Sequence, residues 1–366
     1  MNVLIFFIIL LVLVLVHEFG HFITAKKFGI RVDEFGFGFP PKLFGIKKGE
    51  TEYTFNLLPL GGFVKIFGEN PNEENTTGPD SARSFVNKPK WQQAIVLFAG
   101  VFANFLLAWI LFSFGFMSGL PTSVGAEVEG YPLKDVSLVV VSVTADSPAE
   151  EAGLKSGDKI VRISLGDDST TYISPETVRS MVLASKGKEL DIDYTRGTDR
   201  TLTQIKMIPK VPEGGGDAVI GITMDQIGTA KLPFLVAFKE GLSLTLFVTK
   251  NTALGLFGLI WDGLKGQGSL AGVTGPVGMV GIVGDAYQFG FVYLLSFAAL
   301  ISVNLAIINL LPFPALDGGR LFFLLIEKIK GSRINPKFSN IANLVGFVIL
   351  ILLMVFITYH DIVKVF

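Results

Sequence analysis

Residues 14–27 read VLVHEFGHFITAKK, and this stretch decides the fold of the chain. Residues 3–16, which lead into the motif, are uniformly apolar. The mostly apolar pattern then continues until two consecutive lysines end it. About 24 such residues at about 1.5 Å of rise extend about 36 Å, enough to cross a hydrocarbon core of about 30 Å. A cleaved signal peptide would need a positive leading segment and a small-residue cleavage site, and this stretch shows neither. Residues 1–27 are therefore predicted to form a membrane-spanning helix.

The same predicted helix carries the motif HExxH, as His17, Glu18 and His21. Residues four apart lie on one helical face, so both imidazoles can direct a ring nitrogen at one metal ion. Zinc would lower the pKa of a bound water, and the carboxylate of Glu18 could then accept its proton. Ionisable residues near the middle of a membrane helix cost about 2.5–3.5 kcal/mol each on insertion scales, so they are rare and usually functional. The open alternative is a pair of buried histidines that bond to neighbouring helices, with Glu18 as their partner.

A catalytic zinc needs a third protein ligand beside an open position. The chain has no cysteine, and its third histidine, His360, follows the last apolar segment, which is expected to end on the other side of the membrane. Asp317 lies in the stretch NLLPFPALDGGR (309–320), just past an apolar helix that should end at the depth of the motif. We therefore predict that Asp317 is the third ligand. The alternative is that Asp317 only caps the helix that follows it.

The composition points to a protein of the lipid bilayer. Hydrophobic residues make up 50% of the chain and charged residues 17%, whereas soluble domains carry about 25% charged residues. The formal net charge of −1 gives no support for nucleic-acid binding. Without cysteine, disulfides, iron–sulfur clusters and thiolate–zinc sites are excluded.

The hydropathy pattern predicts a polytopic α-helical membrane protein with four transmembrane helices, at residues 1–27, 91–117, 289–320 and 339–366. The second helix has few strong polar interruptions, one of which is Asn104. Between the helices we predict a β-hairpin region with a loop over 28–90 and a soluble α/β domain over 124–227. Residues 228–288 are predicted to form amphipathic surface helices and, at 271–284, a glycine-rich re-entrant or packed loop. A cytoplasmic loop is predicted over 321–338.

The distribution of Lys and Arg orients these helices. Ten of these residues lie between positions 26 and 90, and five lie between 320 and 337. By the positive-inside rule both loops are cytoplasmic, so the N-terminus, the soluble domain and the C-terminus are expected outside the cytoplasm. Segment 232–262 is apolar but interrupted by charges, and we expect it at the membrane surface. A fifth crossing there would move Asp317 to the face opposite His17.

The stretches HEFGH, GGFVKIFGE, TGPVG and NLLPFPALDGG, in this order, resemble those of the site-2 proteases, and most of all the regulator-of-sigma-E protease branch. The resemblance implies a zinc metalloprotease of the bacterial inner membrane that cleaves transmembrane segments of single-spanning proteins, such as anti-sigma factors or remnant signal peptides. It implies that His17, His21 and Asp317 bind Zn²⁺ and that Glu18 is the general base. The oligomeric state is left open.

The resemblance also implies residues that contact the substrate. Asn309, whose amide could hold a substrate backbone, an oxyanion or a neighbouring helix, falls at a substrate-contacting asparagine of the family. Pro312 and Pro314 fall at its helix-breaking prolines. A peptide bond must leave its helix to be cut, and Gly61, Gly62 and Phe63, followed by Val64, could pair with the extended substrate as a strand edge. The alternative is a hairpin that only packs against the first helix.

Within the soluble domain, SPAEEAGLKSGDKIVRI (147–163) resembles the core of bacterial PDZ domains. A single copy is present, and the loop that binds a peptide carboxylate in other PDZ domains is not apparent. Three roles stay open for this domain: peptide binding, exclusion of bulky substrates, and spacing.

The rival function class is a membrane transporter or scaffold that uses the same residues to hold an ion. A transporter would be expected to carry polar residues along several helices and internal repeats. The second and fourth predicted helices show almost no such residues. The sequence therefore favours the protease.

Overall fold

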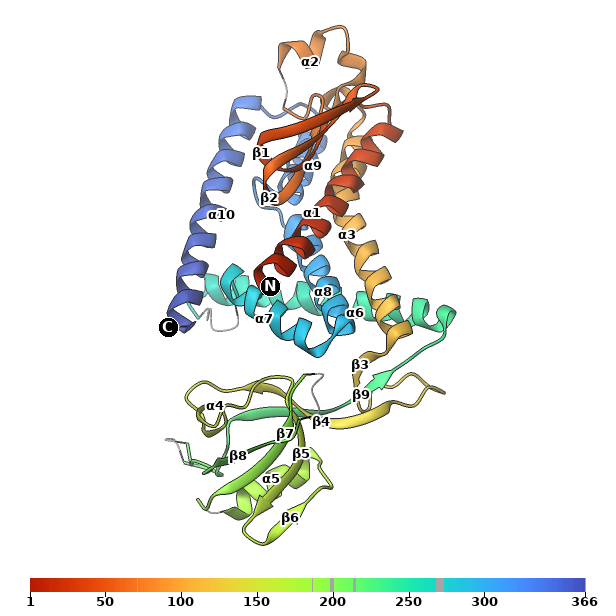
Figure 1. Cartoon of the computed structure of the whole chain (residues 1–366). Coiled ribbons are helices and arrows are strands. Elements are labelled where there is room, and N and C mark those ends of the chain that lie inside the picture. The colour runs from red at the N-terminus through yellow and green to blue at the C-terminus, as the bar shows by residue number, and fades with distance from the viewer. Residues whose placement is uncertain (71, 186, 198–200, 213–214, 268–272, 366) are drawn as a thin grey trace. The chain divides into compact units, whose positions relative to one another are not determined.

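The computed structural model describes residues 1–70, 72–185, 187–197, 201–212, 215–267 and 273–365 (Figure 1). The chain divides into two compact units. Unit 1 comprises Met1–Phe112, Gly241–Val283 and Phe297–Phe366. Unit 2 comprises Ser113–Glu240 and Gly284–Ser296.

Each of the four predicted apolar segments forms a helix: α1 (Asn2–Lys27), α3 (Lys90–Ser118), α8 (Phe291–Leu310) and α10 (Pro336–Val365). The charged residues of α1 are confined to its second half, and its lysines lie in the last turn, where cations complement the helix dipole. Within the described ranges, five helices are long and apolar enough to cross a membrane: these four and α6 (Phe234–Leu264). The number of crossings therefore depends on α6.

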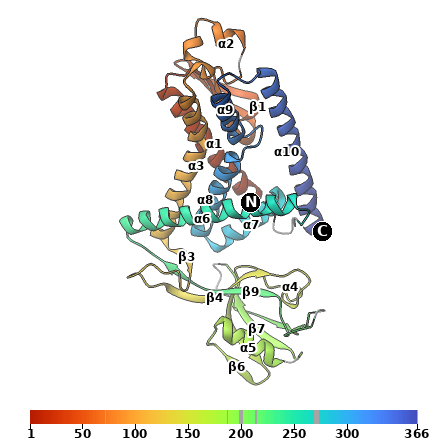
Figure 2. The same ribbon diagram turned by 180° about the vertical axis from the view of Figure 1, so that it is seen from behind.

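Helix α6 is one continuous helix of 31 residues, where more than one amphipathic surface helix was predicted. Its Leu244 and Val248 pack against apolar residues of α3 and α8. In Figures 1 and 2 its ribbon runs across α3 and α8 rather than alongside them. The placement of this segment at the membrane surface stays a prediction.

The prediction of a glycine-rich loop over 271–284 is wrong from Pro276 onward, because Pro276–Phe289 forms helix α7. Residues 271 and 272 lie outside the described chain. The start of α7 is held by Asp361 of α10, whose carboxylate accepts hydrogen bonds from the Gly275 and Gly278 amides at 3.1 and 2.9 Å. The proline at the first position of α7 and the capping carboxylate of Asp361 offset the low helix propensity of its glycines.

The predicted cytoplasmic loop over 321–338 also contains a helix, α9 (Asp317–Lys330). Its Leu321 and Leu324 pack on a core formed by the end of α1, the start of α3 and the adjoining sheet. Gly331 ends α9 in the left-handed conformation, with φ 75°. The third predicted helix therefore stops at Leu310, and its final residues belong to a turn and to α9.

The region after α1 is a strongly bent antiparallel hairpin of β1 (Val32–Lys48) and β2 (Thr51–Ile66). Gly36 of β1 pairs with both Phe63 and Thr54, and Thr54 pairs in turn with Gly45. The two bent strands therefore form four antiparallel segments, in the order 62–66, 32–37, 52–55 and 42–48. Segment 62–66 lies at one edge of this sheet.

The loop that follows the hairpin contains short helices rather than irregular chain alone: α2 (Glu73–Thr77) and the 3₁₀ turns Ser81–Arg83 and Phe85–Asn87. Asn72 begins α2 with a reciprocal capping box to Asn75.

Unit 2 contains, among its described residues, a seven-stranded sheet in the order β3-β9-β4-β5-β7-β8, with β6 paired to β5. The strands are β3 (Leu120–Ser123), β4 (Lys134–Val143), β5 (Lys159–Leu165), β6 (Asp168–Thr170), β7 (Leu190–Thr195), β8 (Thr203–Met207) and β9 (Ile222–Ala230). Helices α4 (Pro148–Glu151) and α5 (Pro175–Ser185) lie between these strands in the chain, and α5 packs on a core of apolar residues. The predicted α/β domain over 124–227 is therefore slightly too short at both ends.

Candidate metal centre

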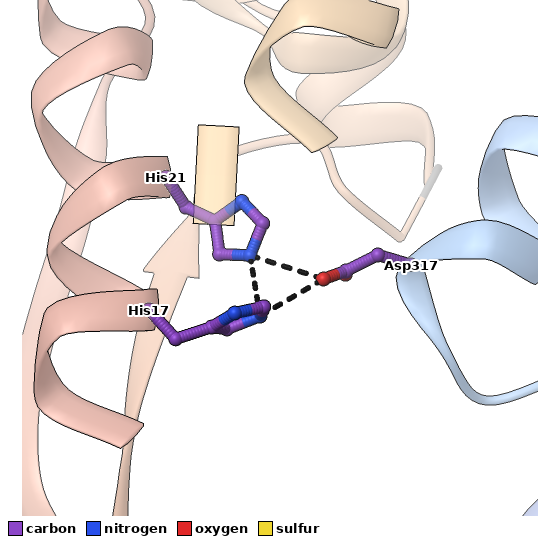
Figure 3. A group of neighbouring side chains, drawn as sticks. All are labelled: His17, His21 and Asp317. Atoms are coloured by element: carbon purple, nitrogen blue, oxygen red, sulfur yellow. Dashed lines mark hydrogen bonds and ion pairs between the residues drawn. The ribbon is translucent and has the colours of Figure 1, made fainter. Parts of the chain in front are cut away.

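Three side chains from distant parts of unit 1 meet at one point (Figure 3). His17 and His21, one turn apart on α1, are both buried, and their Nε2 atoms lie 3.1 Å apart. The Asp317 Oδ2 atom lies 2.9 Å from His17 Nε2 and 3.2 Å from His21 Nε2. The structure therefore brings together the three residues that were predicted as metal ligands, and His360 is not part of the group.

The backbone around Asp317 is shaped to deliver this carboxylate. Ala315, two residues before it, has a positive φ of 76°, an uncommon conformation for a residue other than glycine. Gly318 and Gly319 are buried, and side chains there would collide with the backbone between Leu310 and Pro314. Asp317 is the first residue of α9, after the N-cap residue Leu316, and among the described residues its carboxylate contacts the two imidazoles. Its carboxylate points to the imidazoles, as Figure 3 shows.

Helix α3 supplies the surroundings of both imidazoles, a role that the sequence did not reveal. His21 Nδ1 lies 2.8 Å from the carbonyl oxygen of Val96, and His17 Nδ1 lies 3.4 Å from Asn104 Nδ2. Between these two positions, a side chain at Gly100 would collide with both rings. The available sequence signal was a glycine and an asparagine four residues apart in a helix otherwise almost free of polar residues.

A cavity of about 320 Å³ is lined by His17 and Asp317. Of the other predicted site residues, Glu18, Gly61, Gly62 and Asn309 line it. Phe63, Pro312 and Pro314 are not among its lining residues; they lie on β2 and in the turn after α8. The hairpin and α8 thus reach the same space as the HExxH motif.

The edge segment of β2 packs closely on α1 at this cavity. A Cβ atom at Gly62 would stand 2.9 Å from both the Gly36 carbonyl oxygen and Leu15 Cδ2, so glycine permits this contact. The backbone of Val64 lies close to the Glu18 carboxylate. Val64 pairs with Phe35 on its other side, so the outer edge of the sheet faces Glu18.

The three ligand atoms fit a zinc ion. In tetrahedral coordination with ligand distances of about 2.0–2.2 Å, neighbouring ligand atoms are about 3.3–3.6 Å apart. The observed separations of 2.9, 3.1 and 3.2 Å are slightly shorter, so a small outward movement would admit the ion. Two imidazoles and one carboxylate are a typical donor set for catalytic zinc, and the cavity leaves room for a fourth ligand.

Nearly the whole chain is similar to known proteins. The model of peptidase family M50 matches residues 5–353. A putative zinc metalloprotease of Clostridium perfringens is 37% identical over 353 residues, which cover 96% of this chain and 95% of the relative. The regulator of sigma-W protease RasP of Bacillus subtilis is 31% identical over 441 aligned positions, covering 100% of this chain and 99% of the relative.

Among solved structures, the PDZ domain of an SdrC-like protein from Listeria monocytogenes is 26% identical and covers 24% of this chain and 86% of its own. The TM-score of that match is 0.20. The assignment of residues 124–227 as a PDZ-like domain therefore stays a prediction.

Proposed function

Because this chain belongs to peptidase family M50, we propose that it is a zinc endopeptidase that cleaves transmembrane segments of other proteins inside the bilayer. The observation that carries this proposal is the triangle of His17, His21 and Asp317. Two of these residues lie on an apolar helix that is long enough to span a membrane. The relatives are named as zinc metalloproteases, which supports zinc as the ion.

In this proposal the three residues hold the ion, and Glu18 is the general base. Bound zinc would act as a Lewis acid that lowers the pKa of a water molecule and polarises the scissile carbonyl. Glu18 lines the same cavity, where its carboxylate can accept a proton from water and pass it to the leaving nitrogen. The Val64 backbone, which lies close to that carboxylate, would help to orient it.

The substrate would bind as an extended strand along segment 61–66 of β2. A transmembrane helix hides its peptide bonds, and an exposed strand edge supplies replacement hydrogen bonds once the helix is opened. Gly61 and Gly62 line the cavity without side chains, which would let a substrate backbone approach closely. Asn309 lines the opposite part of the cavity, on α8, where its amide could hold the substrate or the oxyanion.

For the remaining predicted residues we propose supporting roles. Pro312 and Pro314 lie in the turn between α8 and α9, where they would end α8 so that Asp317 reaches the imidazoles. Phe63 lies over Gly36 and would stabilise the edge segment. The substrate class proposed is single-spanning membrane proteins, such as anti-sigma factors or remnant signal peptides, in the bacterial inner membrane.

The proposed topology has four crossings, with the N-terminus, the soluble domain and the C-terminus outside the cytoplasm. In Figures 1 and 2 the first turn of α1 and the last turn of α10 lie at one end of unit 1, and the hairpin and α9 lie at the other. This arrangement supports a common side for the two basic loops. If α6 lies at the membrane surface and does not cross it, His17 and Asp317 lie in the same half of the membrane.

The proposal is tested with the purified chain, Glu18→Gln and the exposed-residue control Glu74→Gln, each assayed for zinc content and for cleavage of a model transmembrane substrate. General-base catalysis contributes about 10²–10⁴-fold, so Glu18→Gln should retain zinc and lose that factor in rate. Glu74→Gln should match the wild type. Equal cleavage by Glu18→Gln and the wild type would refute the role of Glu18, and a wild type that binds zinc without cleaving would favour a transporter or scaffold.

A further inference from the structure

Three residues of α3 form a row against the two imidazoles of α1. Val96, Gly100 and Asn104 are spaced four residues apart, so they lie on one face of the helix. All three are buried. We refer to them as the α3 row; Val96 and Asn104 lie next to the Nδ1 atoms of the imidazoles, and Gly100 lies against both rings.

The contact with Val96 fixes which nitrogen of His21 carries the proton. A backbone carbonyl only accepts hydrogen bonds, so His21 Nδ1, at 2.8 Å from the Val96 oxygen, must be the donor. In a neutral imidazole the other nitrogen, Nε2, then has a free lone pair. That nitrogen is the one that faces Asp317.

In the contact between His17 and Asn104, the atom next to the imidazole is a hydrogen-bond donor instead of an acceptor. Asn104 Nδ2, a donor, lies 3.4 Å from His17 Nδ1, while the amide oxygen Oδ1 is buried and has no hydrogen-bond partner among the described residues. A donor at this place would require Nδ1 to accept and would leave the proton on Nε2. A protonated Nε2 could not offer a lone pair to a metal ion. The positions of the amide oxygen and nitrogen are exchanged by a half-turn of the side chain, and both orientations occupy the same volume.

We propose that Asn104 is a positioning residue for the metal ligand His17: its Oδ1 accepts the hydrogen bond from His17 Nδ1 and directs the lone pair of Nε2 toward the zinc. The assignment rests on the proposed zinc site. It gives the buried oxygen a donor, and it gives His17 the same tautomer as His21. Outer-shell partners of this kind orient metal-bound histidines, and their loss weakens metal binding by about 10–100-fold.

Asn104 itself is held in place by a third helix. The hydroxyl of Ser302 on α8 donates to the Asn104 backbone oxygen at 2.8 Å, and both residues are fully buried. Helix α8 also leads to Asp317 through a six-residue turn. The Ser302 bond therefore joins the α3 row to the helix that precedes the third ligand, without contact to an imidazole.

The test uses the full chain in detergent with the variants Asn104→Leu, Asn104→Asp and, as a matched control on α8, Ser296→Ala, whose hydroxyl bonds the Val292 carbonyl of its own helix. Zinc affinity is measured by competition with a chromophoric chelator, and the site geometry by the visible spectrum of the Co²⁺-substituted protein. Asn104→Leu keeps the volume but has no acceptor, so its zinc dissociation constant should rise about 10–100-fold, with an altered Co²⁺ spectrum. Asn104→Asp is an acceptor only, so it should restore wild-type affinity and spectrum. Ser296→Ala should stay within about twofold of the wild type, a change below that expected for loss of an outer-shell partner.

Unchanged zinc affinity in Asn104→Leu would overturn the assignment, as would equal weakening in Asn104→Leu and Asn104→Asp, which would indicate packing or a donor role. A wild type that binds no zinc would overturn the metal site itself, and the assignment with it. The two failures are thus distinguishable. Thermal melting and gel filtration of each variant establish that it is folded, and the Asn104→Asp rescue separates lost hydrogen bonding from lost structure.

Discussion

Gly100 leaves the space that the two imidazoles occupy, so its replacement by alanine should displace them. A Cβ atom at this position would stand 2.3 Å from His21 Nε2, 2.6 Å from His21 Cε1 and 2.8 Å from His17 Cε1. Carbon atoms in contact are about 3.5–4.0 Å apart, so each ring must move by about 0.7 Å or more. Zinc–ligand distances vary by only about 0.2 Å. We therefore predict that the zinc dissociation constant rises about 10–100-fold, or about 1.4–2.7 kcal/mol, within the range that overpacking costs.

The measurement is chelator competition on the purified chain, with Gly255→Ala of α6 as the matched control. An added Cβ atom at Gly255 meets nothing within 4 Å. Alanine favours a helix over glycine by about 1 kcal/mol, so the control should bind zinc like the wild type and melt no lower. Wild-type zinc affinity in Gly100→Ala would refute the reasoning, because it would mean that the rings do not lie against this stretch of backbone.

Two further substitutions test the hairpin and the last helix. Gly62→Val should push β2 off α1, because even a Cβ atom there lies 2.9 Å from Leu15 and from the Gly36 carbonyl. We expect cleavage of a model substrate to fall at least tenfold while the zinc content is kept. Loss of both cleavage and zinc would contradict a role confined to substrate binding. Asp361→Ala removes the carboxylate that two amides at the start of α7 share, so the free energy of unfolding should fall by about 1–3 kcal/mol. A melting temperature equal to that of the wild type would show that this cap is unimportant.

The candidate metal centre could be predicted because helical geometry alone puts His17 and His21 on one face, and the depth of Asp317 follows from the direction of its helix. The first rule depends only on local helical geometry, and the second depends only on the order of the membrane crossings. The α3 row could not be predicted in the same way. Helix α3 is apolar around most of its circumference, so no periodicity in its sequence shows that Gly100 and Asn104 face α1.

The errors in the fold have a common cause in long-range contacts. Helix α7 was predicted as a loop because glycine disfavours helices, whereas its first turn is stabilised by Asp361, more than 80 residues later. The hairpin was predicted, but not the second pairing of Gly36 that places segment 62–66 at the edge facing Glu18. Such pairings depend on where the strands bend and are not visible in alternation alone.

The central claim is that one zinc ion is held by two imidazoles of α1 and the carboxylate of Asp317, and zinc K-edge X-ray absorption on the purified chain tests it most directly. We predict one zinc per chain with four nitrogen or oxygen ligands at about 2.0–2.2 Å, including two imidazoles, and loss of the zinc in Asp317→Ala. A zinc shell without two imidazoles, or an Asp317→Ala variant that keeps full zinc occupancy with an unchanged shell, would contradict it.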